Sequence, residues 1–281
     1  HIPNYPFPER GIRALKAMGD FADNQRRPDD APVRFSVDSA TAERAMETVL
    51  GAGRTVLTDF EARGIFEAYG FRGPRRAIAT TSDEAITAAA QIGYPLVAKI
   101  VSPDILHKTE AGGVRVGIRD EAQMKEAFLA ITAAAKQYKS DAVIEGIELQ
   151  EMVSGVQEII IGVKKDPQFG HLVMFGLGGI FVELLKDVTF RIVPISPAEA
   201  GTMLNDIKGA KLLQGYRKTP SADIEAIEEA ILRVSQLCVD FPHIAELDLN
   251  PLIVKEKGRG IVMVDARIIL EPSTERDSRT K

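Results

Sequence analysis

Residues 142–163 read AVIEGIELQEMVSGVQEIIIGV, two apolar runs that meet at Gly155. Isoleucine, valine and leucine are frequent in both runs and favour β-strands, and a glycine between them permits a sharp bend. The same texture continues as far as Val193, so the sequence predicts strand after strand over residues 142–193.

On both sides of this block, apolar residues recur at helical spacing, with short strands between the helices. Thr58 and Glu61 form a capping box that predicts the start of one such helix. Two closing strands are predicted in the runs IAELDLNPLIV (244–254) and GIVMVDARIIL (260–270). Strand-rich blocks separated by helical blocks indicate an α+β (α/β) fold with two lobes that divide near residue 150.

The ends of the sequence differ from its middle. Apolar spacing over residues 8–21 predicts a short amphipathic helix. A polar linker at 22–37 separates this helix from a folded domain at 38–271, and 272–281 form a polar tail. Because the chain does not open with methionine, we expect residues 1–21 to be the end of an upstream domain.

Composition limits the classes of function. The formal net charge is −5, so no basic surface is expected to attract nucleic acid or an anionic membrane. Cys238 is the single cysteine, which excludes an internal disulfide and suits a reducing cytoplasm. The sequence contains no apolar stretch of membrane-spanning length. These features predict a cytoplasmic protein.

Lys99 lies inside the apolar run PLVAKIV. Burying an ammonium group is costly unless an anion meets it, which favours a phosphate-binding role. The alternative is a lysine of an edge strand whose side chain reaches water.

His107 lies eight residues further along, in a loop that ends at Gly112 and Gly113. Paired glycines let backbone N–H groups approach a phosphate, and a neutral imidazole is a competent nucleophile toward phosphorus. By itself, a loop histidine is more often a solvated surface residue, so its context must decide.

Three polar residues in the closing strands are candidate metal ligands. Asp248 and Asn250 share one face of the first strand, and Asp265 interrupts the second. Carboxylate and amide oxygens on adjacent strands suit Mg²⁺, which takes few protein ligands beside nucleotide phosphates. The alternative is that these are strand-end residues that face water.

The bend after the first apolar run is a candidate nucleotide contact. Exposed backbone at such a hinge can read the edge of an adenine ring, and Glu158 can accept hydrogen bonds from a ribose. The hinge residues are Gln150, Glu151, Met152 and Val153. The same pattern also fits an ordinary hairpin.

Arg191 lies between Phe190 and Ile192 and is a candidate phosphate clamp. An ion pair with Glu183 or Asp187, four residues apart in this segment, is the structural alternative.

Several stretches, in this order, resemble the ATP-grasp domain of the NDP-forming acyl-CoA synthetases, relatives of the succinyl-CoA synthetase β subunit. They read LTDFEARGIFEAYG, GYPLVAKIVSPDILHKTEAGGV, LQEMVSGVQEIIIGVKKDPQFG, VMFGLGGIFVELLKDVTFRIVPIS and ELDLNPLIV followed by VDARI. The resemblance covers about Thr55 to Leu270 and implies two lobes that grip a nucleotide. The opening HIPNYPFPERGIRALKAM resembles the family's segment where the CoA-ligase portion ends.

The resemblance implies a role for each candidate residue. Lys99 would contact the ATP phosphates next to the loop of Gly112 and Gly113, residues 150–153 would hold adenine, and Glu158 would bind ribose. Magnesium would be held by Asn250 and Asp265, with Asp248 beside them.

His107 would receive a phosphoryl group and carry it between an acyl phosphate and ADP, or back from ATP. Apart from the resemblance, phosphoryl transfer needs charge neutralisation, which Lys99, Arg191 and Mg²⁺ would supply.

The implied reaction is ATP + carboxylic acid + CoA ⇌ ADP + phosphate + acyl-CoA. This chain would perform the nucleotide half with ATP or ADP and Mg²⁺. CoA and the acyl phosphate would be handled by ligase domains that are absent from this chain, either fused upstream or on another subunit of an oligomer. One alternative is an ATP-grasp regulatory module of an acetyltransferase fusion protein. Another is a different ATP-grasp ligase that acts through a free acyl phosphate and would not need His107.

Overall fold

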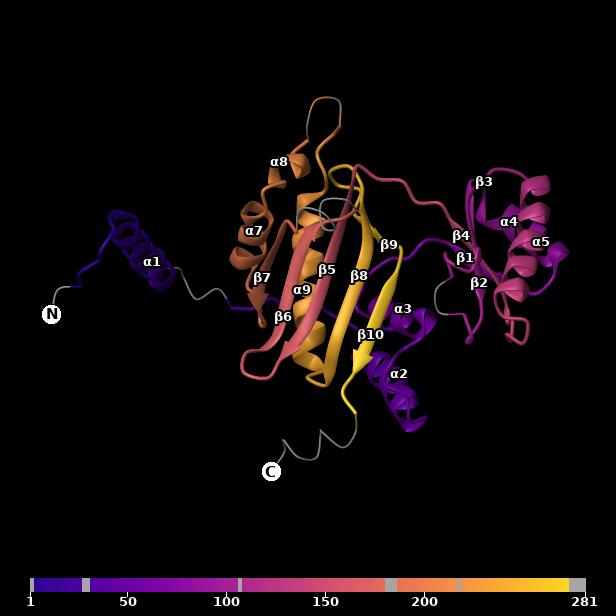
Figure 1. The fold of residues 1–281 in the computed structure, drawn as a ribbon, viewed down its shortest axis with the longest axis horizontal. Coiled ribbons are helices and arrows are strands. Elements are labelled where there is room, and N and C mark those ends of the chain that lie inside the picture. Colours follow the sequence, from indigo (N-terminus) through magenta and orange to yellow (C-terminus); the bar gives the residue numbers. More distant parts are fainter. Residues whose placement is uncertain are drawn as a thin grey trace.

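The computed structural model describes residues 3–26, 31–105, 108–179, 186–215, 217 and 219–272. Two antiparallel sheets, each with helices on one face, form the two lobes of an ATP-grasp-like α+β arrangement (Figure 1). In the described part of the chain, no helix combines the length and the apolar character needed to cross a membrane.

The smaller sheet has the strand order β1-β4-β2-β3. Its apolar residues pack against two helices on one face, so that its other face is open to the second lobe. The elements of this lobe are β1 (Arg76–Ala79), α4 (Ser82–Ile92), β2 (Leu96–Val101), β3 (Val114–Ile118), α5 (Glu121–Tyr138) and β4 (Gly146–Glu151).

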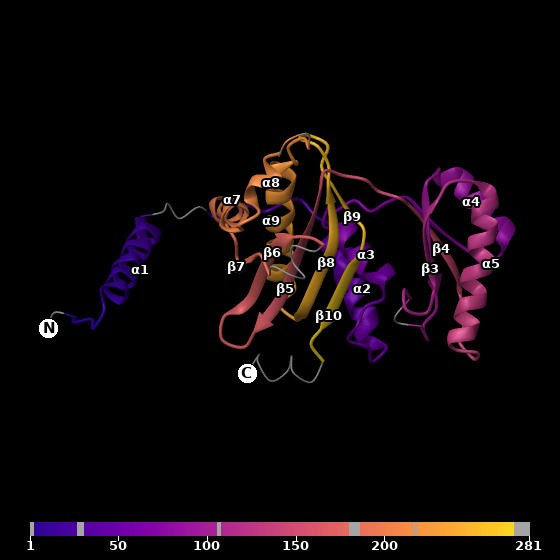
Figure 2. The same ribbon diagram turned by 45° about the horizontal axis from the view of Figure 1, so that its top comes forward.

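The larger sheet has the strand order β10-β8-β5-β6-β7, with β9 paired to β8. Helix α9 lies along one face of this sheet in Figures 1 and 2 and buries its apolar side there. The elements are β5 (Gln157–Asp166), β6 (Gly170–Leu177), β7 (Val188–Ile192), α7 (Pro197–Asp206), α8 (Ala210–Leu213), α9 (Ile224–Asp240), β8 (Ile244–Val254), β9 (Ile261–Met263) and β10 (Ala266–Leu270).

Two helices that precede the small sheet in sequence belong to the core of the large one. They are α2 (Ser39–Gly51) and α3 (Asp59–Ala68). Just before α3, the backbone N–H of Leu57 donates to the carbonyl of Ile268 in β10 at 3.1 Å. The chain therefore passes between the lobes twice, and the expected division near residue 150 corresponds to the second passage.

The closing strand predicted over residues 260–270 is two strands, β9 and β10. Strand β8 pairs with β10 up to Leu249 and with β9 from Leu252 onward. Pro251 lies between these registers and has no N–H to donate to a ladder. The continuous strand is therefore corrected to two short ones, and Asp265 lies at the break between them.

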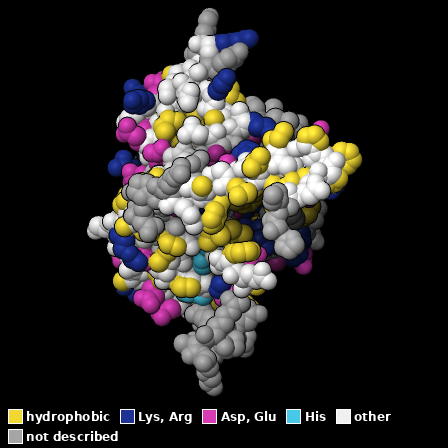
Figure 3. Space-filling model, turned by 90° about the vertical axis from the view of Figure 1, so that its left-hand side faces the viewer, with side chains coloured by type: hydrophobic (Ala, Val, Ile, Leu, Met, Phe, Trp, Pro, Cys, Tyr) yellow, Lys and Arg dark blue, Asp and Glu magenta, His cyan; other side chains and the backbone are white. Residues whose placement is uncertain are grey.

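Helix α1 runs from Pro8 to Arg26, so it extends past Phe21 into the segment expected to be a linker. It stands apart from both sheets in Figures 1 and 2, and its apolar face is exposed at Ile12, Leu15 and Met18. Hydrophobic side chains gather near the middle of the face that Figure 3 shows. An uncovered apolar helix face of this kind is typical of a surface that packs against another unit.

Candidate functional site

A cavity of about 470 Å³ is lined by residues of both lobes. Lys99 of β2 and Glu148 of β4 come from the small sheet, and Asp265 comes from the break between β9 and β10. Asp59, the first residue of α3, also lines it. The other lining residues are Lys108, Thr109, Glu110 and Val114. Candidates far apart in sequence thus meet in one space.

Lys99 is half-buried on the open face of the small sheet. Its neighbours Ala98 and Ile100 are buried in the core, because side chains alternate along a strand. The Lys99 Nζ donates to Oε1 of Gln150 at 2.9 Å. The present partner of Lys99 is therefore an amide, and its contact with a phosphate stays a prediction.

Glu148 is a site residue that the sequence analysis missed. It lies directly opposite Lys99 in the register of β2 and β4, and only 6% of it is exposed. Its carboxylate is 3.5 Å from the guanidinium of Arg76 on β1. Glu148 alternates with Gln150 on one face of β4, and this spacing was the available signal.

The acidic end of the cavity fits a divalent cation. Asp265 and Asp59 line the same cavity. Burial and the charge of Asp59 raise the pKa of the Asp265 carboxyl, while the ammonium of Lys99 acts in the opposite direction. Carboxylates held this close repel one another when ionised, and a cation such as Mg²⁺ removes that repulsion.

Asn250 and Asp248 lie on β8 beside this acidic end. The backbone N–H of Asn250 donates to the carbonyl of Asp265 at 3.3 Å, which ties β8 to the strand break. Burial, followed by the charge of Asp265, raises the pKa of Asp248. Among the described residues, no three His, Cys, Asp or Glu side chains form a ready-made metal cluster. Mg²⁺ needs few protein ligands, so the donor set still fits it.

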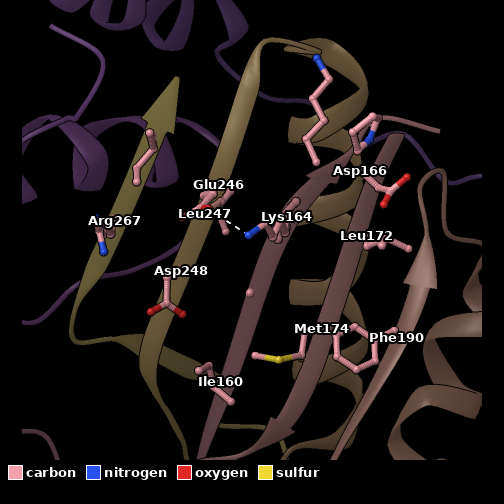
Figure 4. Close-up of a pocket in the computed structure, with 15 residues that line it drawn as sticks. Ile160, Lys164, Asp166, Leu172, Met174, Phe190, Glu246, Leu247, Asp248 and Arg267 are labelled. Atoms are coloured by element: carbon pink, nitrogen blue, oxygen red, sulfur yellow. Dashed lines mark ion pairs between the residues drawn. The ribbon is translucent and has the colours of Figure 1, made fainter. Parts of the chain in front are cut away.

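Asp248 itself faces a neighbouring cavity of about 590 Å³ on the open face of the large sheet (Figure 4). Its apolar lining includes Met174 and Phe190, and an ion pair between Lys164 and Glu246, 3.5 Å apart, crosses its rim. Phe190 is 54% exposed. The structure therefore separates Asp248 from the cavity that holds Lys99 and Asp265, although the two aspartates are close enough to interact.

The hinge segment is tied to both lobes. The Met152 N–H donates to the carbonyl of Pro95 in the small lobe at 3.1 Å, and the Val156 N–H donates to Val254 in the large lobe at 2.8 Å. Residues 153–155 form the connection between these two anchors. The segment does not form the simple hairpin that was its alternative, because β4 and β5 belong to different sheets.

Glu151 and Glu158 have different environments. An ion pair with Arg75, 3.0 Å long, lowers the pKa of Glu151 and holds its side chain. Glu158 is exposed at the start of β5, where it lines a separate cavity of about 340 Å³ with Gly178 and Gly179. A role of Glu158 toward ribose stays a prediction.

The two glycines close the loop before β3. The Gly112 N–H donates to Thr109 at 3.1 Å and the Gly113 N–H donates to Lys108 at 2.8 Å. Both N–H groups are thus used inside the loop rather than presented to a phosphate, which corrects the expectation for them. His107 lies outside the described residues, and its neighbour Lys108 lines the cavity.

Arg191 is engaged with helix α7 and does not line the cavity of Lys99. Its guanidinium forms a 2.5 Å ion pair with Asp206 and a 3.2 Å hydrogen bond to Thr202. Asp187 instead accepts the backbone N–H of Lys208 at 2.7 Å, and Glu183 lies outside the described residues. The expected phosphate clamp is therefore replaced, in this structure, by a structural ion pair whose partner the sequence did not indicate.

Comparison with known proteins adds a family to this geometry. A family model described as an ATP-grasp domain matches residues 48–270. The β subunit of ADP-forming acetate–CoA ligase II of Pyrococcus furiosus is 47% identical over 231 residues, which cover 82% of this chain and 98% of that subunit. The ADP-forming 4-hydroxybutyrate–CoA ligase of Nitrosopumilus maritimus is 43% identical over 268 residues. This alignment covers 95% of the chain but only 38% of that longer relative.

Solved structures agree with these sequence relatives. A crystal structure from Pyrococcus horikoshii is 47% identical with a TM-score of 0.76, and the match covers 83% of this chain and 99% of that one. A dinucleotide-forming acetyl-coenzyme A synthetase 1 from Ca. Korarchaeum cryptofilum, solved with coenzyme A and Mg-AMPPCP, is 39% identical with a TM-score of 0.71. That match covers 82% of this chain and 100% of the solved chain, whose phosphohistidine segment points towards its nucleotide binding site.

Proposed function

This chain belongs to the ATP-grasp domains of the ADP-forming acyl-CoA ligases, and we propose that it performs the nucleotide half of their reaction. In that reaction ATP, a carboxylic acid and CoA are converted reversibly to ADP, phosphate and acyl-CoA. The acid, the CoA and the acyl phosphate are handled by ligase domains outside this chain. The cytoplasm is the proposed setting, in keeping with the single cysteine.

One observation carries this proposal. A cation from the small lobe, Lys99, and an acidic group from the large lobe, Asp265, line the same cavity. Phosphates of a nucleotide require positive charge, and their Mg²⁺ requires oxygen ligands. A cavity that offers both from opposite lobes suits a Mg-nucleotide held between them.

The residues of the chain divide the work by their chemistry. Lys99 binds phosphate oxygens as a point charge, and Asp265 with Asn250 holds Mg²⁺. When bound, Mg²⁺ neutralises phosphate charge during transfer. The hinge around Met152 connects the two sheets and is the proposed contact of adenine, and Glu158 at the start of β5 is the proposed contact of the ribose.

His107 is the proposed carrier of the phosphoryl group. A ring nitrogen of the neutral imidazole forms a bond to the γ-phosphorus of ATP as the bond from that phosphorus to the β–γ bridging oxygen breaks, and ADP leaves. In the other direction, ADP takes the phosphoryl group and the imidazole is restored. Lys108, beside His107, lines the same cavity and offsets charge on the group being moved.

Phosphohistidine analysis tests this proposal. The full chain is incubated with Mg·ATP and digested under alkaline conditions, which preserve phosphohistidine, and the peptides are examined by mass spectrometry. We expect an acid-labile phosphate on His107 and none in the His107→Asn variant. His243→Asn is the matched control, because it removes a different histidine and is expected to retain the label.

A chain that binds ADP but carries no phosphate on His107 would favour a regulatory ATP-grasp module instead. Retained labelling in His107→Asn would remove His107 from this role.

The same proposal assigns helix α1 to the end of an upstream ligase domain, with residues after it as the linker. The exposed apolar face of α1 supports this assignment, because such a face gains stability by packing against another unit. Hydrogen exchange is the measurement: amides of α1 should exchange rapidly in this chain and slowly once the ligase half is attached or bound. Equal protection in both samples would contradict the assignment. Oligomeric assembly with the ligase half is part of the same proposal.

A further inference from the structure

Asp59 occupies a position that its helix does not explain. It is the first residue of α3, but the helix is already capped by Thr58 and Glu61, which form a complete capping box. Its carboxylate lines the cavity of Lys99 and Asp265 rather than closing the helix end. A carboxylate in the first turn of a helix is slightly stabilised by the helix dipole. The alternative to a role in the cavity is therefore that Asp59 only stabilises the start of α3.

A buried arginine fixes Asp59 in place. The side chain of Arg63, one turn further along α3, is 1% exposed. Its Nε–H is shared between both carboxylate oxygens of Asp59, at 2.8 and 3.0 Å. One of its terminal N–H groups donates to the carbonyl of Val264, the residue immediately before Asp265. The same guanidinium therefore holds Asp59 and the strand break that carries Asp265.

The result is an arranged pair of acids at one end of the cavity. Asp59 and Asp265 line the same cavity, and Arg63 binds both the Asp59 carboxylate and the backbone next to Asp265. A flexible acidic side chain would turn away from its neighbour to reduce repulsion, but Asp59 is held in position by the buried guanidinium. Arg76 approaches Asp59 at 3.8 Å but is also paired with Glu148 at 3.5 Å.

We infer that Asp59 is an additional acidic residue at the metal end of the nucleotide site, where it binds the hydrated divalent cation together with Asp265, and that Arg63 positions it. This inference rests on the proposed nucleotide function. It assigns the role to α3, which lies outside the strands and loops that carry the residues expected from the sequence. The negative charge of Asp59 should matter when the metal is present and should not favour the nucleotide when the metal is absent.

The test measures how much a metal ion improves ADP binding. Calorimetry on the full chain gives the dissociation constant of ADP in EDTA and again with saturating Mn²⁺, and electron paramagnetic resonance counts bound Mn²⁺ directly. The wild-type chain should bind ADP more tightly with Mn²⁺ than in EDTA. For Asp59→Asn we expect this Mn²⁺-dependent gain in ADP affinity to fall by about 10- to 100-fold, as for supporting residues of other metal sites. Metal-free ADP affinity should be unchanged or slightly higher, because one negative charge is removed.

Asp83→Asn is the matched control. Asp83 lies in the first turn of α4, behind a capping box formed by Thr81 and Glu84, so it shares the local setting of Asp59 but is exposed elsewhere. The Mn²⁺-dependent gain in ADP affinity of Asp83→Asn should equal that of the wild type.

Folding and binding are separated by a second variant. If Asp59→Asn leaves Arg63 without its carboxylate partner and does not fold, the double variant Asp59→Asn with Arg63→Met removes the buried guanidinium as well, and the same measurement is made on it. A full Mn²⁺-dependent gain in either variant would overturn the inference and leave the nucleotide function intact. A wild-type chain that binds no ADP under either condition would instead refute the proposed function.

Discussion

Replacing Lys99 with methionine tests the nucleotide site directly. Methionine keeps a similar apolar stem and removes the ammonium group, so the change is electrostatic rather than steric. Lys99 is half-buried. Its ammonium group and a phosphate charge 4 Å away would attract each other by about 4 kcal/mol at an effective dielectric constant of ~20. Desolvation cancels part of this, and a hydrogen bond to a charged group is worth about 1.5–3 kcal/mol net. The affinity for Mg·ADP should therefore fall by roughly 10- to 150-fold.

The structure also predicts a separate effect of this variant on folding. Lys99 donates to the Gln150 side chain, which is 2% exposed, so its removal leaves a buried amide oxygen without that donor. We expect the free energy of unfolding to fall by about 1 kcal/mol, measured by urea denaturation. Calorimetry must therefore be performed far below the unfolding midpoint, where both proteins are folded.

Lys164→Met provides the matched control for this prediction. Lys164 is exposed on the open face of the large sheet and pairs with Glu246 at 3.5 Å. An exposed ion pair of this kind contributes little, so both ADP affinity and stability should stay near the wild-type values. If Lys99→Met bound Mg·ADP within twofold of the wild type, the assignment of this cavity to the phosphates would be refuted.

Other positions give independent tests. Arg191→Ala removes the ion pair with Asp206 and should lower the free energy of unfolding by about 0.5–1 kcal/mol, while calorimetry should show unchanged ADP affinity; a loss of affinity would return Arg191 to the nucleotide site. Gly113→Ala places a Cβ atom 2.5 Å from Cγ2 of Ile100, so the free energy of unfolding should fall by about 1–3 kcal/mol. The thermal midpoint should drop accordingly, and an unchanged midpoint would contradict this packing. Burial lowers the pKa of His171, so the unfolded chain binds more protons and stability should decrease as pH falls below about 6.5; His171→Gln should flatten that dependence in thermal melts.

Strand β8 shows what the sequence could specify by itself. Leu247 and Leu249 in IAELDLNPLIV alternate with polar residues, and only one register of the strand buries them. The predicted strand and the observed one accordingly cover the same residues, 244–254. The break at Asp265 was not predictable in this way, because it arises where β8 changes partners at Pro251, and partner choice is set by distant parts of the chain.

The missed residues have a similar explanation. The capping box of Thr58 and Glu61 already explained where α3 begins. Nothing else in the sequence pattern marked Asp59 as a residue of the nucleotide site. The amphipathic pattern of α3 shows which of its faces is buried but does not say against which sheet. Arg191 was compared with acids in its own segment, whereas its partner Asp206 lies on the helix that packs beside its strand.

The first turn of α3 connects the two lobes. Arg76 of β1 is 3.8 Å from Asp59 and lies 5.0 Å from the ring centroid of Phe60, and Arg63 reaches the break before Asp265. These contacts lie where the chain passes from the large lobe to the small one. A nucleotide held by Lys99 on one side and through its metal by Asp265 on the other would add a further connection between the same lobes. Its binding energy would then depend on how the lobes are oriented, and any ligand that binds one orientation better shifts the population toward it.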